Sequence, residues 1–304
     1  MKRRHFVQQG IGAAAFLGLG GFTSSAFNAT SKHITILHTN DVHSHIDPFG
    51  PNDGRNANQG GVARRTVLIE QIRKENPNTL LLDAGDIFQG TPYFNYYGGE
   101  LEFKLMSMMK YDASTIGNHD FDNGVDGLYA QLPHANFEFV CANYDFSNTV
   151  MDGHVRPYKI FELDGIKIGV FGLGIELQGL VNKFLYKETV YLDPIEITQD
   201  MTRILKEEKN CDLVICLSHL GYYYKDSEFK KVSDLSLASQ TKNIDLIIGG
   251  HTHTFLKKPT VTENLMGNKM LINQVGCYGI NLGRIDFYLD ANKNKSANGT
   301  SIIV

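Results

Sequence analysis

Short apolar runs alternate with amphipathic stretches along most of the chain. Runs rich in aliphatic and β-branched residues, such as Ile34–Thr39 (ITILHT) and Thr79–Asp83 (TLLLD), predict buried strands. The helical spacing of apolar residues in Val62–Ile72 predicts a helix, which ends before the Asn76-Pro77 pair. The same criteria predict further strands at Ala113–Ile116, Phe139–Ala142, Ile166–Phe171, Leu213–Leu217, Ile244–Ile248, Lys269–Val275 and Gly283–Leu289, and helices at Glu100–Met109, Glu196–Glu208 and around Glu228–Ser239. Strands that alternate with helices indicate a layered α/β fold, with antiparallel pairing near the C-terminus.

Residues 1–26 have the three-part pattern of a secretory signal peptide. Met1–Gln9 is basic and lacks acidic residues, Ile11–Phe22 is apolar and rich in Gly and Ala, and Thr23–Ala26 is small and polar. The Arg3-Arg4 pair resembles a twin-arginine signal, although an ordinary secretory signal or an uncleaved anchor stays open. We therefore expect a periplasmic or otherwise exported protein with no stable membrane anchor after cleavage.

Composition narrows the class of the remaining chain. The net charge of −4 among 304 residues argues against binding to a nucleic-acid polymer, which normally needs a basic surface. The 4 cysteines are too few for a disulfide scaffold. The chain is long enough for two domains. However, the motifs described next extend across nearly all of it, so we expect one catalytic domain over residues 27–290 and a polar, frayed C-terminal tail over 291–304.

Polar residues cluster directly after the predicted strands. In layered α/β folds the carboxyl ends of strands are where sites are built, so these residues should meet at one edge. Alone, each is typical of a solvated turn or a structural histidine, but the ordered set supplies enough carboxylate, imidazole and amide ligands for two divalent ions. Such donors, without thiolate, favour Zn, Mn, Fe or similar ions. The set comprises Asp41 and His43 (Asp-x-His), Asp86 (Gly-Asp), Asn118 and His119 (Gly-Asn-His-Asp), His219, and His251 and His253 (Gly-His-x-His).

The order of these motifs resembles that of the calcineurin-like metallophosphoesterases. More narrowly, four segments resemble the bacterial 5′-nucleotidase, UDP-sugar hydrolase and 2′,3′-cyclic phosphodiesterase family: ITILHTNDVHSHI at 34–46, GDIFQGTP at 85–92, YDASTIGNHDFD at 111–122 and SHLG at 218–221. The resemblance extends from about Ile34 to Leu289. One position departs from the family pattern, because Asp120 stands where a Glu is usual.

The resemblance implies a fold, a set of metal ligands and a catalytic pair. The fold would be a four-layer αββα sandwich of two mixed sheets with helices outside. His119 would be the catalytic histidine, steadied by Asp122. Of the two metal ions, one would be held by Asp41, His43, Asp86 and His253, and the other by Asp86, Asn118, His219 and His251, with Asp86 bridging.

The expected activity is hydrolysis of nucleotide phosphate monoesters by in-line attack of metal-activated water. A broad-specificity or 2′,3′-cyclic nucleotide phosphodiesterase, a sulfur-ester hydrolase and a non-enzymatic metal-binding envelope protein remain alternatives. The family normally carries a C-terminal substrate domain, for which no sequence follows the last predicted strand. A separate polypeptide that resembles that domain is therefore a candidate partner, beside the small phosphate-ester substrate.

Overall fold

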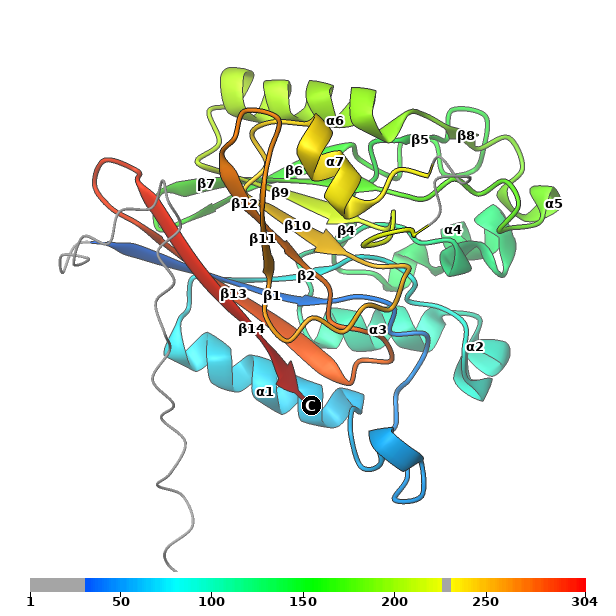
Figure 1. The fold of residues 1–304 in the computed structure, drawn as a ribbon. Coiled ribbons are helices and arrows are strands. Elements are labelled where there is room, and N and C mark those ends of the chain that lie inside the picture. The colour runs from blue at the N-terminus through cyan, green and yellow to red at the C-terminus, as the bar shows by residue number, and fades with distance from the viewer. Residues whose placement is uncertain (1–30, 226–230) are drawn as a thin grey trace, which may run out of the picture.

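Two six-stranded β-sheets form the centre of the protein, as seen in a computed structural model that describes residues 31–225 and 231–304 (Figure 1). The proposed signal segment at 1–26 lies outside these residues. The first sheet has the order β14-β13-β1-β2-β3-β4 and the second β11-β12-β10-β9-β7-β6, and β5 pairs with β8 in a small third sheet. The strands are β1 (Lys32–Thr39), β2 (Thr79–Asp83), β3 (Ala113–Ser114), β4 (Glu138–Phe139), β5 (Tyr144–Asp145), β6 (Tyr158–Leu163), β7 (Ile166–Leu173), β8 (Val190–Tyr191), β9 (Leu213–Ser218), β10 (Leu246–Gly249), β11 (Thr260–Glu263), β12 (Lys269–Asn273), β13 (Asn281–Leu289) and β14 (Lys295–Ile303).

Helices cover the outer face of each large sheet. In Figure 1, α1 and α3 lie below the first sheet, and α6 and α7 lie above the second. The helices are α1 (Val62–Glu75), α2 (Pro92–Tyr97), α3 (Glu100–Met108), α4 (Gly124–Gln131), α5 (Lys183–Tyr186), α6 (Pro194–Arg203), which continues as a π-helical turn at Ile204–Glu208, and α7 (Asp234–Gln240). The arrangement confirms the expected four-layer αββα sandwich.

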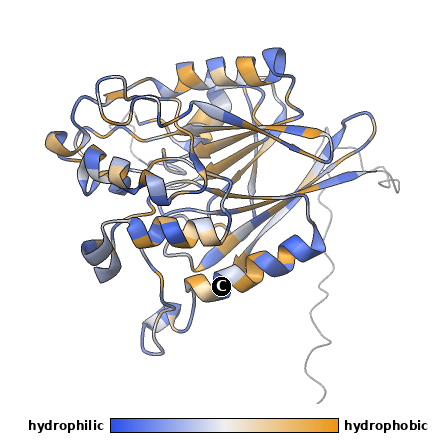
Figure 2. Ribbon diagram, turned by 180° about the vertical axis from the view of Figure 1, so that it is seen from behind, coloured by the Kyte–Doolittle hydropathy of each residue, from blue (hydrophilic) through white to orange (hydrophobic). Residues whose placement is uncertain are grey.

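The alternation of side chains along the strands explains why apolar side chains fill all three spaces between the four layers of the sandwich. Successive residues of a strand point to opposite faces of its sheet. In β2, Leu80 and Leu82 pack between the two sheets, whereas Leu81 packs against the helices below. In β9, Ile215 faces the space between the sheets and Cys216 faces α6 and α7. Buried on both faces, the central strands are mostly apolar, and Figure 2 shows them as the hydrophobic interior of the ribbon.

Parallel strands in both sheets set the position of the site. In the first sheet β1, β2, β3 and β4 are parallel, and in the second β7, β9, β10 and β12 are parallel. The strands β13, β14, β6 and β11 pair antiparallel at the outer parts of the sheets. The carboxyl ends of the parallel strands therefore open toward the same end of the sandwich.

The predicted polar tail is the main correction to the expected organisation. Residues 295–303 form β14, which pairs with β13 from Lys295 opposite Leu289 to Ile303 opposite Asn281. The Asp290 carboxylate accepts the backbone N–H groups of Asn292 and Asn294 and so closes the hairpin turn. Backbone hydrogen bonds to one neighbour sustain an edge strand whose residues are largely polar. A polar composition was therefore a poor guide to fraying here.

Other predicted elements are close to the observed ones, and several were missed. The strands predicted at 79–83 and 213–217 and the helix predicted at 62–72 agree with β2, β9 and α1 to within three residues at either end. The helix expected around Glu228 begins only at Asp234, and its predicted start lies outside the described residues. The pattern did not reveal α2, α4, β6 or β11, which are short or half-exposed.

Gly172 in β7 packs directly against the residues that follow β3 and β4 in the other sheet. A Cβ atom there would stand 1.9 Å from the carbonyl oxygen of Val140 and 2.5 Å from the Thr115 hydroxyl, so only glycine fits. The Gly172 carbonyl also accepts the backbone N–H of Ala142 at 2.8 Å. This close contact accounts for Gly172 as a packing requirement between the sheets.

Candidate metal centre

The residues singled out from the sequence come together at the carboxyl ends of five strands. Figure 1 shows these ends on the same side of the sandwich, the side toward which β9 and β10 point. Asp41 and His43 follow β1, Asp86 follows β2, Asn118 and His119 follow β3, His219 follows β9, and His251 and His253 follow β10. Both sheets therefore contribute to one site.

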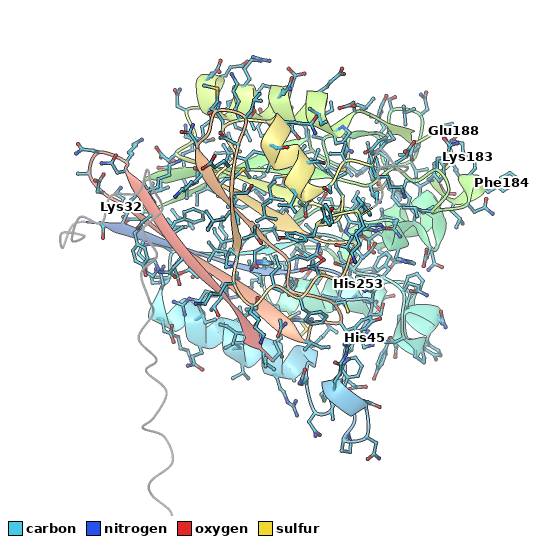
Figure 3. The ribbon with its side chains drawn as sticks, viewed as in Figure 1. Lys32, His45, Lys183, Phe184, Glu188 and His253 are labelled. Atoms are coloured by element: carbon cyan, nitrogen blue, oxygen red, sulfur yellow. The ribbon has the colours of Figure 1, made fainter. Side chains whose placement is uncertain are left out.

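The first group consists of Asp41, His43 and His253. One ligand atom from each lies within 4.8 Å of those of the others. Oδ1 of Asp41 is 3.3 Å from Nε2 of His253 and 4.0 Å from Nε2 of His43, and the two Nε2 atoms are 3.0 Å apart. Figure 3 labels His253 and the neighbouring His45, both of which pack against Tyr278 at the rim of the site.

The second group consists of Asp86, His219 and His251, with Asn118 beside it. Its three ligand atoms also lie within 4.8 Å of one another. Oδ2 of Asp86 is 3.0 Å from Nε2 of His219, and the Asn118 amide oxygen is 2.8 Å from Nδ1 of His251.

Asp86 lies between the two groups. Its Oδ2 atom, 3.0 Å from His219 in the second group, is also 3.8 Å from Nε2 of His43 in the first. Its other oxygen, Oδ1, accepts the backbone N–H of His119 at 2.8 Å, which fixes the plane of the carboxylate. Asp86 thus faces a histidine nitrogen of each group.

The orientation of the histidine rings fits metal ions. Nδ1 of His43 lies 3.1 Å from the Phe88 carbonyl and Nδ1 of His219 lies 2.7 Å from the Ala84 carbonyl. A carbonyl only accepts, so Nδ1 carries a hydrogen in both rings, and Nε2 has a lone pair to offer a metal ion whenever the ring is neutral. Nε2 of His219 is buried and has no hydrogen-bond partner among the described residues, although it faces the Asp86 carboxylate. A cation between them would satisfy both groups, and backbone carbonyls commonly orient metal-binding histidines in this way.

Burial and mutual attraction set the charges in the site. Burial opposes charge on His219, but the Asp86 and Asp41 carboxylates outweigh it and raise its pKa to about 10. The same opposition between burial and Asp41 raises the pKa of His253 to about 10. Asp86 is buried too, but His219 holds the pKa of its carboxyl below the usual range. The carboxylates thus attract positive charge strongly, and divalent ions would displace the protons held there.

His119 and Asp122 form a hydrogen-bonded pair at the site, where the His119 ring lies edge-on to that of His43 in the first group. Nδ1 of His119 is 2.9 Å from Oδ2 of Asp122, and both side chains are partly exposed. Hydrogen bonding to Asp122 is the main effect that raises the pKa of His119, against the opposing effect of burial. The pair is therefore partly open to solvent, and the hydrogen bond fixes the orientation of the His119 ring.

The profile of the calcineurin-like phosphoesterase family matches residues 34–255, which is more than half of the chain. The chain belongs to this family. The trifunctional nucleotide phosphoesterase protein YfkN of Bacillus subtilis (strain 168) is 35% identical over 289 residues, which cover 84% of this chain and 18% of that protein. Human 5′-nucleotidase is 32% identical over 324 residues, covering 96% of this chain and 52% of the relative.

Solved structures agree with the membership. A 5′-nucleotidase precursor from Thermus thermophilus aligns with a TM-score of 0.80 at 32% identity over 90% of this chain and 55% of that one. A sulfate thiohydrolase from the same species, 17% identical with a TM-score of 0.74, shares the fold. The chain thus spans about half the length, or less, of the relatives named here. None of the helices in the described ranges combines the length and apolar character needed to cross a bilayer.

Backbone strain is concentrated at the proposed ligands of this phosphoesterase domain. Five of the seven have φ between 49° and 70°, a region that residues other than glycine adopt rarely: Asp41, His43, Asp86, His251 and His253. Such strain persists only where the surroundings hold it in place. The sharp turns aim side chains from the strand ends into a single space.

Three residues that hold these turns were not predicted as parts of the site. Asn40 donates from Nδ2 to Asp41 Oδ2 at 2.6 Å and to the Gly276 carbonyl at 2.6 Å. Gln274 donates to the Gly250 carbonyl and accepts from Thr252 and Thr254, and so it braces the turn with His251. Asn40 and Asp120 stand inside quoted motifs and could have been found there, whereas Gln274 carries no comparable signal.

Asp120 is the central support of the turns after β2 and β3. Its buried carboxylate accepts four backbone N–H groups, those of Asp86 (3.1 Å), Ile87 (2.9 Å), Phe88 (3.2 Å) and Gly117 (2.8 Å). Gly117 allows the turns to meet, since a Cβ there would lie 2.2 Å from Oδ1 of Asp86. Asp120 occupies a position where the resemblance leads us to expect Glu, and its shorter side chain still reaches the four backbone donors.

We expect Asp120→Ala to lower the free energy of unfolding of the metal-free protein by at least about 3 kcal/mol, because it leaves four buried donors without an acceptor. Urea unfolding measures the loss. The matched control is Asp290→Ala, which removes a carboxylate that accepts backbone N–H groups in a surface turn, and its loss should be clearly smaller. Equal effects of the two substitutions would contradict the role assigned to Asp120.

Proposed function

We propose that the protein is a metal-dependent phosphoesterase that hydrolyses phosphate monoesters of nucleotides. The observation that supports this most directly is the pair of adjoining carboxylate and imidazole groups with Asp86 between them. Nucleotide substrates are supported by the names of the relatives, among them a nucleotide phosphoesterase and several 5′-nucleotidases.

In this proposal Asp41, His43, Asp86 and His253 hold one divalent ion, and Asp86, Asn118, His219 and His251 hold the other. When bound, the ions neutralise the phosphoryl oxygens and lower the pKa of a water molecule that attacks phosphorus. The donor set contains nitrogen and oxygen but no thiolate, which suits Zn, Mn, Fe or a similar ion.

His119 acts on the substrate in this proposal. Its ring lies 5.2 Å, centroid to centroid, from that of His43, and its backbone N–H donates to the Asp86 carboxylate, so the side chain is placed to reach a phosphoryl group held in the site. The Asp122 carboxylate favours its charged form. A charged imidazole can stabilise the negative charge of the transferring group and give a proton to the leaving alkoxide.

Two further proposals, on export and on a partner polypeptide, do not depend on the geometry of the site. The basic, apolar and small-polar pattern of residues 1–26 supports a cleaved signal peptide, with a twin-arginine route and a periplasmic or otherwise exported destination. We also propose, from the family resemblance alone, that a separate polypeptide can provide further contacts to the substrate.

His119→Ala tests the catalytic role. We expect kcat to fall about 100-fold or more, since a general acid typically contributes that much, while the metal content per chain stays unchanged. The control is His33→Ala, because His33 also pairs with a carboxylate, Asp286, at 2.8 Å, but far from the site on the β1–β13 pair. Steady-state rates and elemental analysis of the same samples give both quantities. An unchanged kcat in His119→Ala would remove this residue from the mechanism.

A substrate panel tests the reaction class. The isolated, metal-loaded chain should hydrolyse AMP and p-nitrophenyl phosphate and lose both activities in EDTA, with UDP-glucose and 2′,3′-cyclic AMP as the other substrates in the panel. If a second polypeptide provides selectivity, kcat/KM for AMP should exceed that for p-nitrophenyl phosphate by less than about tenfold. A single hydrophobic contact to the substrate can already provide discrimination of about that size. Strong selectivity for AMP would contradict the partner proposal alone, and no release of phosphate from any substrate would contradict the proposed function.

A further inference from the structure

Three aromatic rings form a cluster at the rim of the site, outside the proposed metal and catalytic residues. They belong to His45 in the turn after β1, Phe49 in the loop that follows, and Tyr278 between β12 and β13. Each ring contacts the other two, with centroid distances of 4.2 Å for His45–Tyr278, 5.2 Å for His45–Phe49 and 6.0 Å for Phe49–Tyr278. Two distant parts of the chain therefore meet in one aromatic cluster.

The aromatic cluster adjoins the first group of proposed metal ligands. The ring of Tyr278 lies 6.0 Å from that of His43 and 5.9 Å from that of His253, centroid to centroid. Figure 3 labels His45 and His253 one below the other. The His43 ring also lies 5.2 Å from that of His119, which is the proposed proton donor to the leaving group. A leaving group that receives this proton is therefore only two ring contacts away from the aromatic cluster.

The rings of the aromatic cluster do not serve the apolar interior. His45, Phe49 and Tyr278 are all half-buried, so each keeps part of its surface open to solvent. In the part of the chain that the structure describes, the three apolar clusters between the layers include neither Phe49 nor Tyr278, and neither ring packs against them. Aromatic surface beside convergent polar groups is typical of a ligand site.

The backbone holds both large rings in place. Tyr278 has a φ of 62°, which is a rare outlier for a bulky residue, and its N–H donates to the Asp41 carbonyl at 2.7 Å. Phe49 donates its N–H to the Gln59 carbonyl at 2.9 Å and accepts the N–H of Asn58 at 3.0 Å. A ring thus stands at a position where glycine would relieve the strain, and such strain is concentrated at functional sites.

An uncharged planar group is the ligand that suits this surface. Aromatic side chains stack on nucleobases of any sequence, because every base has a π-face. A cationic group can also bind to aromatic faces, but the divalent ions proposed for the adjoining site would repel it. The nucleobase of a nucleotide is planar and uncharged, and it is part of the leaving alcohol.

We propose that His45, Phe49 and Tyr278 form a subsite that stacks on the nucleobase of a nucleoside monophosphate. The subsite rests on the proposed phosphoesterase function, and it gives this chain its own preference for nucleotides over sugar phosphates. Because p-nitrophenyl phosphate also carries an aromatic ring, the subsite favours both esters over the phosphate of a plain sugar.

A comparison of AMP with ribose 5-phosphate isolates the contribution of the base. We expect kcat/KM of the metal-loaded chain to be about tenfold or more higher for AMP, since one stacked base typically contributes at least a factor of this order. Tyr278→Asn should remove most of this preference, because asparagine tolerates a positive φ but has no ring. Tyr278→Phe should keep it, because stacking does not need the hydroxyl. In both variants kcat/KM for ribose 5-phosphate should stay within about twofold of the wild-type value, since neither change touches the proposed metal ligands.

Phe49→Leu is a second test that keeps an apolar side chain but removes the ring. It should lower the preference for AMP by about threefold, which is typical of the loss of one aromatic contact. The matched control is Tyr129→Leu on α4, since the ring of Tyr129 is also partly exposed and also contacts a histidine, His154, at 5.0 Å, outside the site. The control should leave the preference for AMP unchanged.

Binding of phosphonate analogues tests the subsite without turnover. In these analogues of AMP and ribose 5-phosphate a methylene group replaces the bridging oxygen, so the bond to the leaving group is not hydrolysed. Calorimetry with the Mn²⁺-loaded chain should show that the AMP analogue binds about tenfold more tightly, and that Tyr278→Asn removes the difference.

The outcomes separate the subsite from the proposed function. Equal affinities for the two analogues, or a preference that persists in both Tyr278→Asn and Phe49→Leu, would overturn the subsite. Weaker binding of both analogues to the same extent in Tyr278→Asn would show only a structural effect on the metal site, which also contradicts it. A preference in binding without release of phosphate from either ester would contradict the proposed function and support the subsite.

Discussion

Two buried carboxylates, Asp41 and Asp86, place the main electrostatic constraint on this protein. Both are almost fully inaccessible, and both lie within 4.0 Å of the Nε2 atoms of His43 and His219. Negative charge buried to this extent is stable only when cations or protons compensate it. In His43 and His219, Nδ1 is already hydrogen-bonded to a backbone carbonyl, and Nε2 faces the carboxylates. The arrangement therefore favours positive charge at two adjoining points. The turns, their strain and the residues that brace them all follow from the need to hold these groups together.

The sandwich provides the rigid frame for this arrangement. Parallel strands from two sheets end at the same side, and five of them are followed directly by the proposed site residues. The strain in these turns is offset by hydrogen bonds from groups outside the ligand set, above all the Asp120 carboxylate and the amides of Asn40 and Gln274. Preorganised ligands need little rearrangement when ions bind, and a phosphoryl transition state depends on position and charge neutralisation more than on covalent help.

Much of the site could be predicted from the sequence because its residues stand immediately after apolar strand patterns. Asp86 follows TLLLD and His219 follows the run at 213–217, so strand prediction alone placed them at one edge. The bracing residues were harder to predict, because the role of Gln274 depends on a turn some twenty residues earlier in the chain. The strand at 283–289 was predicted correctly, but its hairpin partner β14 was missed, since an edge strand is sustained by backbone pairing that a polar composition does not reveal.

The central claim is that the two side-chain groups hold two metal ions with Asp86 shared between them. Anomalous diffraction from crystals of the full chain loaded with Mn²⁺ tests it most directly, recorded at and below the manganese absorption edge. The account predicts two manganese peaks per chain, one in contact with Asp41, His43 and His253, the other in contact with Asn118, His219 and His251, and both in contact with Asp86. A single peak, or two peaks that do not share Asp86, would contradict it.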